Sequence, residues 1–421
     1  MSATYRFPRG FLWGAATSSH QVEGNNRWND WWEFEQAGRL PYRSEDACRH
    51  FELYESDFDL AHSWGHNAHR LSVEWSRIEP AQGEFSTDAL NHYVDVVAAL
   101  KERHIEPVVT LHHFTNPAWF TRRGGWTRTD SIDLFRRYVE AVSSRMADRV
   151  RFWVTINEPT VYVTRAFLKG NWPPCQPGSW LRAGRALRNL CRAHTAAYAT
   201  IHKHRPDAMV GFAHSTPYVV ALDPGRRLDR FAARLRDFVH NDLCFRLLGQ
   251  TPRRVLDFIG INYYVRQLVR WQLGGTAMLV GKEHKASNPS QSRKFSSLGW
   301  EVYPDGLREV LTRFAAFGVP LMITENGIST SDEALRTEFI AAHIRALALA
   351  MRDGVRVIGY FYWTMFDNFE WTEGPTARFG LAAVDPATKL RGPRPAAGLF
   401  ESICRSNEIQ LNEPHRGTTR Q

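Results

Sequence analysis

Two glutamates of this chain follow apolar, β-branched runs, a setting in which a carboxylate is costly unless something uses it. Glu158 lies in the string TINEP and Glu325 in the string ITENG. Runs of this kind are typical of strands buried in a parallel sheet. Burying a charged group costs free energy unless a partner or a reaction compensates for it. Two such carboxylates on different strands therefore indicate paired acid/base chemistry.

Paired glutamates suit the hydrolysis of a glycosidic bond, in which one group protonates the leaving oxygen and the other acts at the anomeric carbon. If Glu325 is ionised nearby, like-charge repulsion raises the pKa of Glu158 and keeps this group protonated. Arg70, near the end of another expected strand, is the candidate cation that holds Glu325 ionised. Once a sugar esterifies Glu325, Glu158 should lose its proton more readily and act as the base toward water.

Eight short apolar runs alternate with amphipathic helical patterns along the chain. The expected strands are Phe11–Ser18, Ala68–Glu74, Pro107–His113, Phe152–Asn157, Met209–His214, Asp257–Tyr264, Pro320–Glu325 and Val357–Trp363. Eight strand–helix units predict an α/β fold, a (β/α)8 barrel forming one domain over residues 1–421, with its active site at the carboxyl ends of the strands. A doubly wound open sheet is the alternative, but no glycine-rich phosphate loop follows the first strand.

Three helices are indicated by apolar residues at helical spacing. The first helix is lined by residues 90, 94, 97 and 100 and follows Ser86 and Thr87, which are suitable N-caps. The second helix is lined by residues 132, 135, 139, 142 and 146, and the third begins near Leu335. These helices alternate with the strands as a barrel requires.

Polar and aromatic residues gather where the expected strands end, whereas the strand bodies are apolar. These residues are His20, Gln21, Arg70, Glu74, His112, His113, Asn157, Glu158, Asn262, Tyr264, Glu325 and Trp363. In a closed barrel these ends meet on one face. The irregular stretch Val265–Trp300, which contains Gly274-Gly275, is expected to be a long loop on that same face.

Composition and charge exclude several classes of protein. The 421 residues carry a net charge of +9, and aromatic residues make up 13% of the chain, including 15 Trp, which fits a large core or stacking platforms for a ligand. Arg182, Arg185, Arg188 and Arg192 recur at helical spacing, so they are expected to form a solvated helix face. No nucleic-acid motif accompanies this basic stretch, so we expect no nucleic-acid partner.

The cysteines and the first residues favour a cytoplasmic protein. The five cysteines are scattered, odd in number and without CxxC pairing, which favours reduced thiols. The opening MSATYRFPRGFLWG lacks the apolar region of a signal peptide, and no run is long enough to span a membrane. His112-His113 has no third ligand at suitable spacing, so no metal is expected.

The ordered motifs FLWGAATSSHQVEG, TINEP, GINYY, ITENG and NFEW resemble glycoside hydrolase family 1, the β-glucosidase and β-galactosidase family. The similarity runs from about Phe7 to about Phe400. It implies a (β/α)8 barrel that hydrolyses β-glycosides with retention and without cofactor or metal. It also implies that Glu158 is the acid/base and Glu325 the nucleophile, with carboxyls roughly 5 Å apart. The oligomeric state and the natural aglycone are not readable.

The same resemblance implies roles for further residues. Arg70 and Tyr264 match residues that contact the nucleophile. The residues that match sugar-binding positions are Gln21, His113, Asn157, Trp363, Glu370 and Trp371, with Trp119 and Phe379 as further positions near the pocket. Amide and carboxylate groups suit adjacent hydroxyls, and an indole face suits the apolar face of a pyranose.

Three departures from the family pattern bear on specificity. Glu74 stands in RLSVEW where many members have a small polar residue, Pro375-Thr376-Ala377 is unusual, and the region between strands five and six is short. The rivals are a 6-phospho-β-glycosidase of the same family and a non-catalytic sugar-binding barrel. Glu370 argues against the first, because a carboxylate repels phosphate. Glu158 and Glu325 argue against the second.

Overall fold

Eight parallel strands close into a barrel in the computed structural model, which describes residues 3–274, 277–284 and 293–411. The barrel strands are β2 (Leu12–Ala16), β3 (Ala68–Ser72), β4 (Glu106–Thr110), β5 (Phe152–Asn157), β6 (Met209–Ser215), β8 (Ile259–Asn262), β11 (Leu321–Asn326) and β12 (Val357–Trp363). Their order around the barrel is β11-β12-β2-β3-β4-β5-β6-β8, and β8 pairs with β11 to close it. The predicted (β/α)8 barrel and all eight predicted strands are confirmed. The extent of the domain, residues 1–421, stays a prediction.

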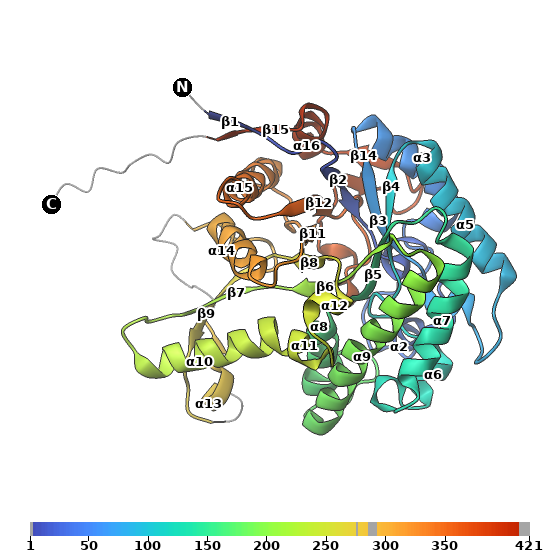
Figure 1. Ribbon diagram of the computed structural model, residues 1–421, viewed down its shortest axis with the longest axis horizontal. Helices are drawn as coiled ribbons and strands as arrows, with labels where there is room; N and C mark the ends of the chain where they lie inside the picture. The colour runs from blue at the N-terminus through green and yellow to red at the C-terminus, as the bar shows by residue number, and fades with distance from the viewer. Residues whose placement is uncertain (1–2, 275–276, 285–292, 412–421) are drawn as a thin grey trace.

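Helices surround the strands and cover the outside of the barrel (Figure 1). The helices that follow successive barrel strands are α3 (His50–Ser63), α5 (Thr87–Glu102), α7 (Ser131–Met146), α9 (Trp180–His204), α11 (Leu243–Leu247), α14 (Pro304–Ala315), α15 (Glu333–Arg352) and α16 (Pro395–Ser406). Helix α5 begins where expected, because the Ser86 side chain accepts a hydrogen bond from the Ala89 amide at 3.1 Å. The arginines at 182, 185, 188 and 192 are exposed on α9, as predicted.

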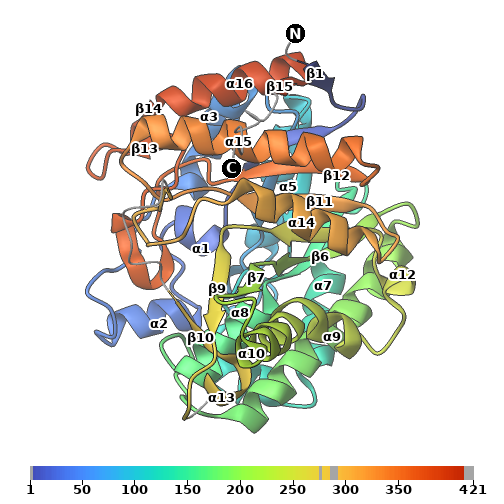
Figure 2. The same ribbon diagram turned by 90° about the vertical axis from the view of Figure 1, so that its left-hand side faces the viewer.

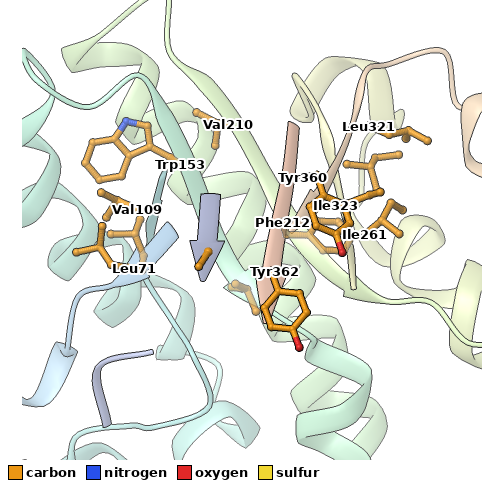
Figure 3. Close-up of a cluster of buried hydrophobic side chains, with 14 of the residues drawn as sticks. Leu71, Val109, Trp153, Val210, Phe212, Ile261, Leu321, Ile323, Tyr360 and Tyr362 are labelled. Carbon is orange, nitrogen blue, oxygen red and sulfur yellow. The ribbon is translucent and has the colours of Figure 1, made fainter. Parts of the chain in front are cut away.

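Each barrel strand is buried on both faces, which explains its nearly continuous apolar sequence. Side chains that point outward pack beneath the helices (Figure 3), and they include Leu71, Val109, Trp153, Val210, Phe212, Ile261, Leu321, Ile323, Tyr360 and Tyr362. Alternate residues form a second cluster inside the barrel, among them Val108, Val154, Met322 and Phe361. Burying one such side chain contributes about 1.5–3 kcal/mol, so this packing fixes the strand ends firmly.

Most of the polar residues expected at the strand ends lie just beyond the last residue of a strand. Strand β4 ends at Thr110, three residues before His113, and β8 ends two residues before Tyr264. Glu158 follows β5 directly, whereas Glu325 lies within β11. The polar side chains thus occupy the rim at the carboxyl end of the barrel.

The expectation of one long loop over 265–300 is wrong for part of that stretch. Residues Arg266–Arg270 form β9, which pairs in parallel with β7 (Tyr218–Ala221) and antiparallel with β10 (Lys282–Glu283). Charged residues at both ends of β9 hide its short apolar centre, and its partner β7 lies far away in sequence. Helix α13 (Ala277–Val280) also falls in this stretch, while residues 275–276 and 285–292, which include Gly275, lie outside the described residues.

The remaining elements are short and connect or flank the barrel. They are β1 (Ala3–Arg6), α1 (Ser19–Val22), α2 (Asp30–Gln36), α4 (Trp75–Ile78), α6 (Ala118–Arg122), η1 (Gly125–Thr127), α8 (Pro159–Val163), η2 (Thr164–Lys169), α10 (Arg227–Asp237), η3 (Phe238–Asp242), α12 (Pro252–Val255), η4 (Trp371–Thr376), β13 (Ala382–Val384), β14 (Arg391–Pro393) and β15 (Glu408–Leu411). Strands β1 and β15 pair beside α16, and α10 lies with α13 and the β7–β9–β10 sheet in both views (Figures 1 and 2). Within the part of the chain that the structure describes, no helix is long and apolar enough to cross a bilayer.

Candidate active site

Glu158 sits at an abrupt turn between strand β5 and helix α8. Its backbone has φ 44° and ψ 60°, the left-handed region that a non-glycine residue adopts at a cost of roughly 1–2 kcal/mol. The Glu158 amide donates to the Ala213 carbonyl of β6 at 2.8 Å, which holds the turn against the neighbouring strand. Its carboxyl Oε1 accepts a hydrogen bond at 2.9 Å from Asn262, beyond β6 on strand β8. The turn thus presents the carboxyl across the end of the barrel.

Arg70 joins four strands from inside the barrel. Its Nη1 donates to Glu325 Oε1 at 2.6 Å, and its Nη2 donates to Asn157 Oδ1 at 2.7 Å. The Arg70 Nε donates to Thr110 Oγ1 at 3.1 Å. Arg70 is fully buried, and its contacts fix the ends of β3, β4, β5 and β11 relative to one another. The structure thus places the Arg70 guanidinium in an ion pair with Glu325, and the role of Arg70 in holding Glu325 ionised stays a prediction.

Asn262 connects the two glutamate-bearing strands, a role that its sequence context did not predict. Its Nδ2 donates both to Glu158 Oε1 at 2.9 Å and to Asn157 Oδ1 at 3.1 Å. Its Oδ1 accepts from Thr324 Oγ1 at 2.6 Å, which fixes the orientation of the amide. The sequence did show a polar residue, Asn262, in GINYY at the end of an apolar run. Its hydrogen-bond partners, however, depend on which strands are neighbours in the barrel.

A second hydrogen bond holds Glu325 from the rim. The Tyr264 hydroxyl donates to Glu325 Oε2 at 2.7 Å, so both carboxylate oxygens have a donor. Phe379 lies edge-on to the Tyr264 ring, with centroids 6.2 Å apart, and Trp300 packs against both rings. Phe379 therefore supports Tyr264 from behind.

The two carboxyls have different electrostatic environments. Burial, followed by repulsion from Glu325, raises the pKa of Glu158 to about 8. Burial also raises the pKa of Glu325, but the Arg70 charge and the Tyr264 hydrogen bond stabilise its ionised form. At neutral pH this arrangement favours a protonated Glu158 beside an ionised Glu325.

Five further predicted residues lie beside this network: Gln21, His113, Trp363, Glu370 and Trp371. We call them the glycone group, because the resemblance predicts that they bind the sugar. Gln21 Nε2 donates to Glu370 Oε2 at 3.0 Å. His113 stacks between the rings of Trp363 and Trp371, with centroids 5.7 and 6.1 Å away. His113 Nε2 also lies 3.2 Å from Asn157 Nδ2, which ties the group to the carboxyl network. Burial and repulsion from Glu325 raise the pKa of Glu370 to about 8.

A model of glycosyl hydrolase family 1 matches residues 3–246 and 246–409. The chain belongs to this family. A β-galactosidase of Pyrococcus woesei is 29% identical over 96% of this chain and 98% of the relative. β-Glucosidase A of Thermotoga maritima is 28% identical over 96% and 99%, and a 6-phospho-β-galactosidase of Staphylococcus aureus is 27% identical over 97% and 100%. The solved structure of a β-glycosidase from Pyrococcus horikoshii aligns with a TM-score of 0.91 at 39% identity, covering 98% and 99% of the two chains. The resemblance to glycoside hydrolases seen in the sequence is thereby confirmed.

Trp119 stands apart from the other predicted positions in this family 1 chain. Its indole nitrogen donates to the Glu79 carbonyl at 2.8 Å, and its ring packs edge-on against Trp75. Its contacts therefore lie with α4 rather than with the glycone group, and its part in substrate binding stays a prediction. Trp31, by contrast, is buried directly behind Trp371, with ring centroids 4.7 Å apart.

Glu74, the unusual carboxylate of this family 1 member, has partners within the structure. It is fully buried and accepts hydrogen bonds from Ser19 at 2.9 Å, Ser76 at 2.7 Å and Thr115 at 3.0 Å. These bonds join the segments that follow β2, β3 and β4. Glu74 is therefore a structural link at the rim.

His20 and His112, two buried histidines near the rim, contact amide and carboxylate groups. His20 contacts Glu35 at 2.9 Å and Asn29 at 3.0 Å, and His112 contacts Asn116 at 3.0 Å. Among residues 3–274, 277–284 and 293–411, no group of three His, Cys, Asp or Glu side chains could hold a metal ion. The site that the structure assembles is built from carboxyl, amide, guanidinium, phenol and indole groups.

Proposed function

We propose that this family 1 enzyme is a retaining β-glycosidase that releases terminal, non-reducing β-D-glucosyl residues, with β-D-galactosyl and β-D-fucosyl residues as side substrates. The observation that carries the proposal is the hydrogen-bonded network in which Arg70, Asn157 and Asn262 join Glu158 to Glu325. Two linked carboxyls, one favoured as the acid and one as the anion, are what double displacement requires. The names of the relatives, a β-glucosidase and a β-galactosidase, agree with this choice of sugars.

In the first step, a Glu325 carboxylate oxygen attacks the anomeric carbon as the bond to the aglycone oxygen breaks. Glu158 gives its proton to that oxygen, so the aglycone leaves as a neutral alcohol. The raised pKa of Glu158 supplies the proton at neutral pH. Arg70 and Tyr264 orient the attacking carboxylate, since each donates to one of its oxygens. The product is a glycosyl ester on Glu325.

In the second step, water attacks the same anomeric carbon and the ester bond to Glu325 breaks. Esterification has removed the charge of Glu325, which is one cause of the raised pKa of Glu158. The pKa of Glu158 therefore falls, and its carboxylate can take a proton from the attacking water. The sugar leaves with its original configuration after two inversions.

The glycone group supports recognition of an unphosphorylated sugar. Gln21 and Glu370 offer adjacent donors and acceptors that can bridge two neighbouring hydroxyls. Trp363 offers an indole face to the pyranose ring. Asn157, fixed by Arg70, stands beside the acid, where the 2-hydroxyl of the sugar can meet it.

A panel of nitrophenyl β-glycosides tests the proposal on the wild type and two variants. Wild type should hydrolyse the glucoside most efficiently, and Glu158→Ala and Glu325→Gly should each lose most activity. Azide added to Glu325→Gly should restore turnover and yield the α-glycosyl azide, because the small anion fills the vacated position. Undiminished hydrolysis by Glu325→Gly would remove this residue from the nucleophile's role, and a β-glycosyl azide from this variant would argue against retention.

The 6-phospho-β-glycosidase alternative is retained because one relative carries that name. Glu370 argues against it, because this group offers no positive charge to a phosphate and repels it once it ionises, near its raised pKa of about 8. Among the described residues, no Lys or Arg forms an ion pair with Glu370 that would reverse this local charge. Faster turnover of nitrophenyl 6-phospho-β-glucoside or -galactoside than of the unphosphorylated sugars would favour the alternative. A purified, folded protein without activity on either set would favour a non-catalytic barrel.

A further inference from the structure

The charge of Arg165 interacts with Glu158, but Arg165 has no part in the proposed reaction. Helix α8 begins directly after Glu158 and continues into the π-helical segment η2, which carries Arg165 about two turns later. Wide turns of this kind occur often at functional sites. Because Glu158 must protonate the leaving oxygen, an aglycone has to pass beside Glu158, the residue with which the Arg165 charge interacts.

The Arg165 guanidinium is packed but has no acidic partner in contact. It lies over the Trp172 ring, 5.7 Å from the centroid. In the orientation that satisfies the Asn171 amide, Asn171 accepts a bond from Arg165 Nη1 and donates one to the Arg165 carbonyl, both at 3.2 Å. Among the residues that the structure describes, no carboxylate forms an ion pair with Arg165. Most of its five N–H donors therefore remain free for a ligand.

The position of Arg165 is fixed between the two segments that border the mouth of the site. Its charge interacts with Glu158 on one side and with Glu373 of η4 on the other. Trp172, which supports it, packs against Trp371 with ring centroids 5.6 Å apart. The Trp172 indole nitrogen is itself buried and has no hydrogen-bond partner among the described residues. The wall beside Trp371 thus contains a cation and an unused donor.

The charges around Arg165 leave its positive charge largely uncompensated. Glu158 is neutral when it is ready to act as the acid, because its pKa is raised to about 8. Glu373 is exposed to solvent, so water screens its charge. Burial lowers the pKa of the Arg165 guanidinium, which means that water solvates this cation poorly. A planar anion with two oxygens would accept two parallel hydrogen bonds from the Arg165 guanidinium.

We propose that Arg165 builds a leaving-group subsite, beside Glu158 and over Trp172, that binds an aglycone carrying a carboxylate. This inference rests on the proposed function and names the class of substrate that the site prefers. Arg165 acts here as a specificity-determining residue, because it contacts the aglycone and not the reacting atoms. The carboxylate takes the place of the missing acidic partner.

The test compares 4-carboxyphenyl β-D-glucoside with its methyl ester, two aglycones that differ chiefly in charge. Arg165→Met should lower kcat/KM for the carboxylate by roughly tenfold or more, the range of a charge-assisted hydrogen bond, mainly through a higher KM. The ester should change less than about threefold. Arg165→Lys should give a kcat/KM for the carboxylate between those of wild type and Arg165→Met, since lysine keeps the positive charge but lacks the planar, bidentate guanidinium. Arg188→Met, an exposed arginine of α9, is the matched control and should leave both substrates unchanged.

Wild type alone supplies a second measurement that does not depend on the folding of a variant. Added NaCl should lower kcat/KM for the carboxylate substrate and leave the ester nearly unaffected. Equal losses for both substrates in Arg165→Met, or no loss for either, would overturn the subsite, as would identical salt dependence. Efficient hydrolysis of the ester in those cases would leave the proposed function intact. If wild type hydrolyses no aryl β-glucoside, the proposed function fails and the subsite fails with it.

Discussion

Replacing Glu325 with glutamine should lower the pKa of Glu158 without abolishing its elevation. Burial and repulsion from Glu325 together raise that pKa to about 8. Two charges about 5 Å apart at an effective dielectric constant of about 20 repel by roughly 3 kcal/mol, which shifts a pKa by about 2. Glu325→Gln removes this repulsion and leaves the burial, so Glu158 should titrate near pH 6, still above an ordinary glutamate.

The pKa can be measured directly by carbon-13 NMR on protein labelled at the glutamate carboxyl carbons. The resonance of Glu158 is assigned by its absence from the double variant Glu158→Gln/Glu325→Gln. Glu401→Gln, on the outer helix α16, is the matched control and should leave the Glu158 titration near pH 8. An unchanged titration in Glu325→Gln would mean that the two carboxyls do not face each other, and the retaining mechanism would lose its electrostatic basis.

Four further predictions follow from the same contacts. Arg70→Met should lower the free energy of unfolding, measured in urea, by about 3–5 kcal/mol, because it leaves the buried Glu325 carboxyl without its cation. A loss below about 1 kcal/mol would contradict this. Glu370→Gln should lower kcat/KM for nitrophenyl β-glucoside roughly tenfold or more with little change in unfolding temperature, and an unchanged kcat/KM would exclude it from sugar binding. Glu74→Gln should reduce stability by about 1–3 kcal/mol while kcat/KM stays within about threefold, whereas a large kinetic loss alone would give Glu74 a catalytic role. Because the folded state raises the pKa of Glu158, the stability that its protonated carboxyl contributes is present at low pH and is lost as pH rises from about 4.5 to about 8. Glu158→Gln should therefore flatten that part of the curve of unfolding free energy against pH. A curve identical to that of the wild type would contradict the raised pKa.

The barrel was predictable because burial on both faces leaves a local signature. A strand such as Phe152–Asn157 is apolar throughout, and this pattern needs no knowledge of its neighbours. The carboxyls of Glu158 and Glu325 were found for the same reason, since each interrupts a run that should otherwise stay apolar. Strand β9 was missed because its ends are charged and its pairing with β7 depends on tertiary contacts.

Of the residues that join the carboxyls, Arg70 was expected beside Glu325, whereas Asn262 could not be assigned from local pattern. The role of Asn262 follows from the order β5–β6–β8 around the barrel, which brings its amide to Glu158. Arg165 looked like any basic residue of a helical segment until its packing on Trp172 and its missing acidic partner were known. Trp119 was matched by resemblance to a position near the pocket, but its ring packs against Trp75 rather than against the glycone group.

The buried charges at the barrel rim cannot be explained by stability alone. Well-packed apolar side chains in place of a buried ion pair often give a protein of equal or greater stability. Arg70 and Glu325 nevertheless occupy the rim above the apolar cluster inside the barrel, and Glu158 adopts a left-handed backbone beside them. The strain and the burial of Glu158 act against folding, whereas the raised pKa that burial produces suits the proposed proton transfer at neutral pH. The fold tolerates this combination because eight packed strands hold the rim in place. In the proposed function, the same rigidity keeps Glu158 and Glu325 in register for a sugar between them.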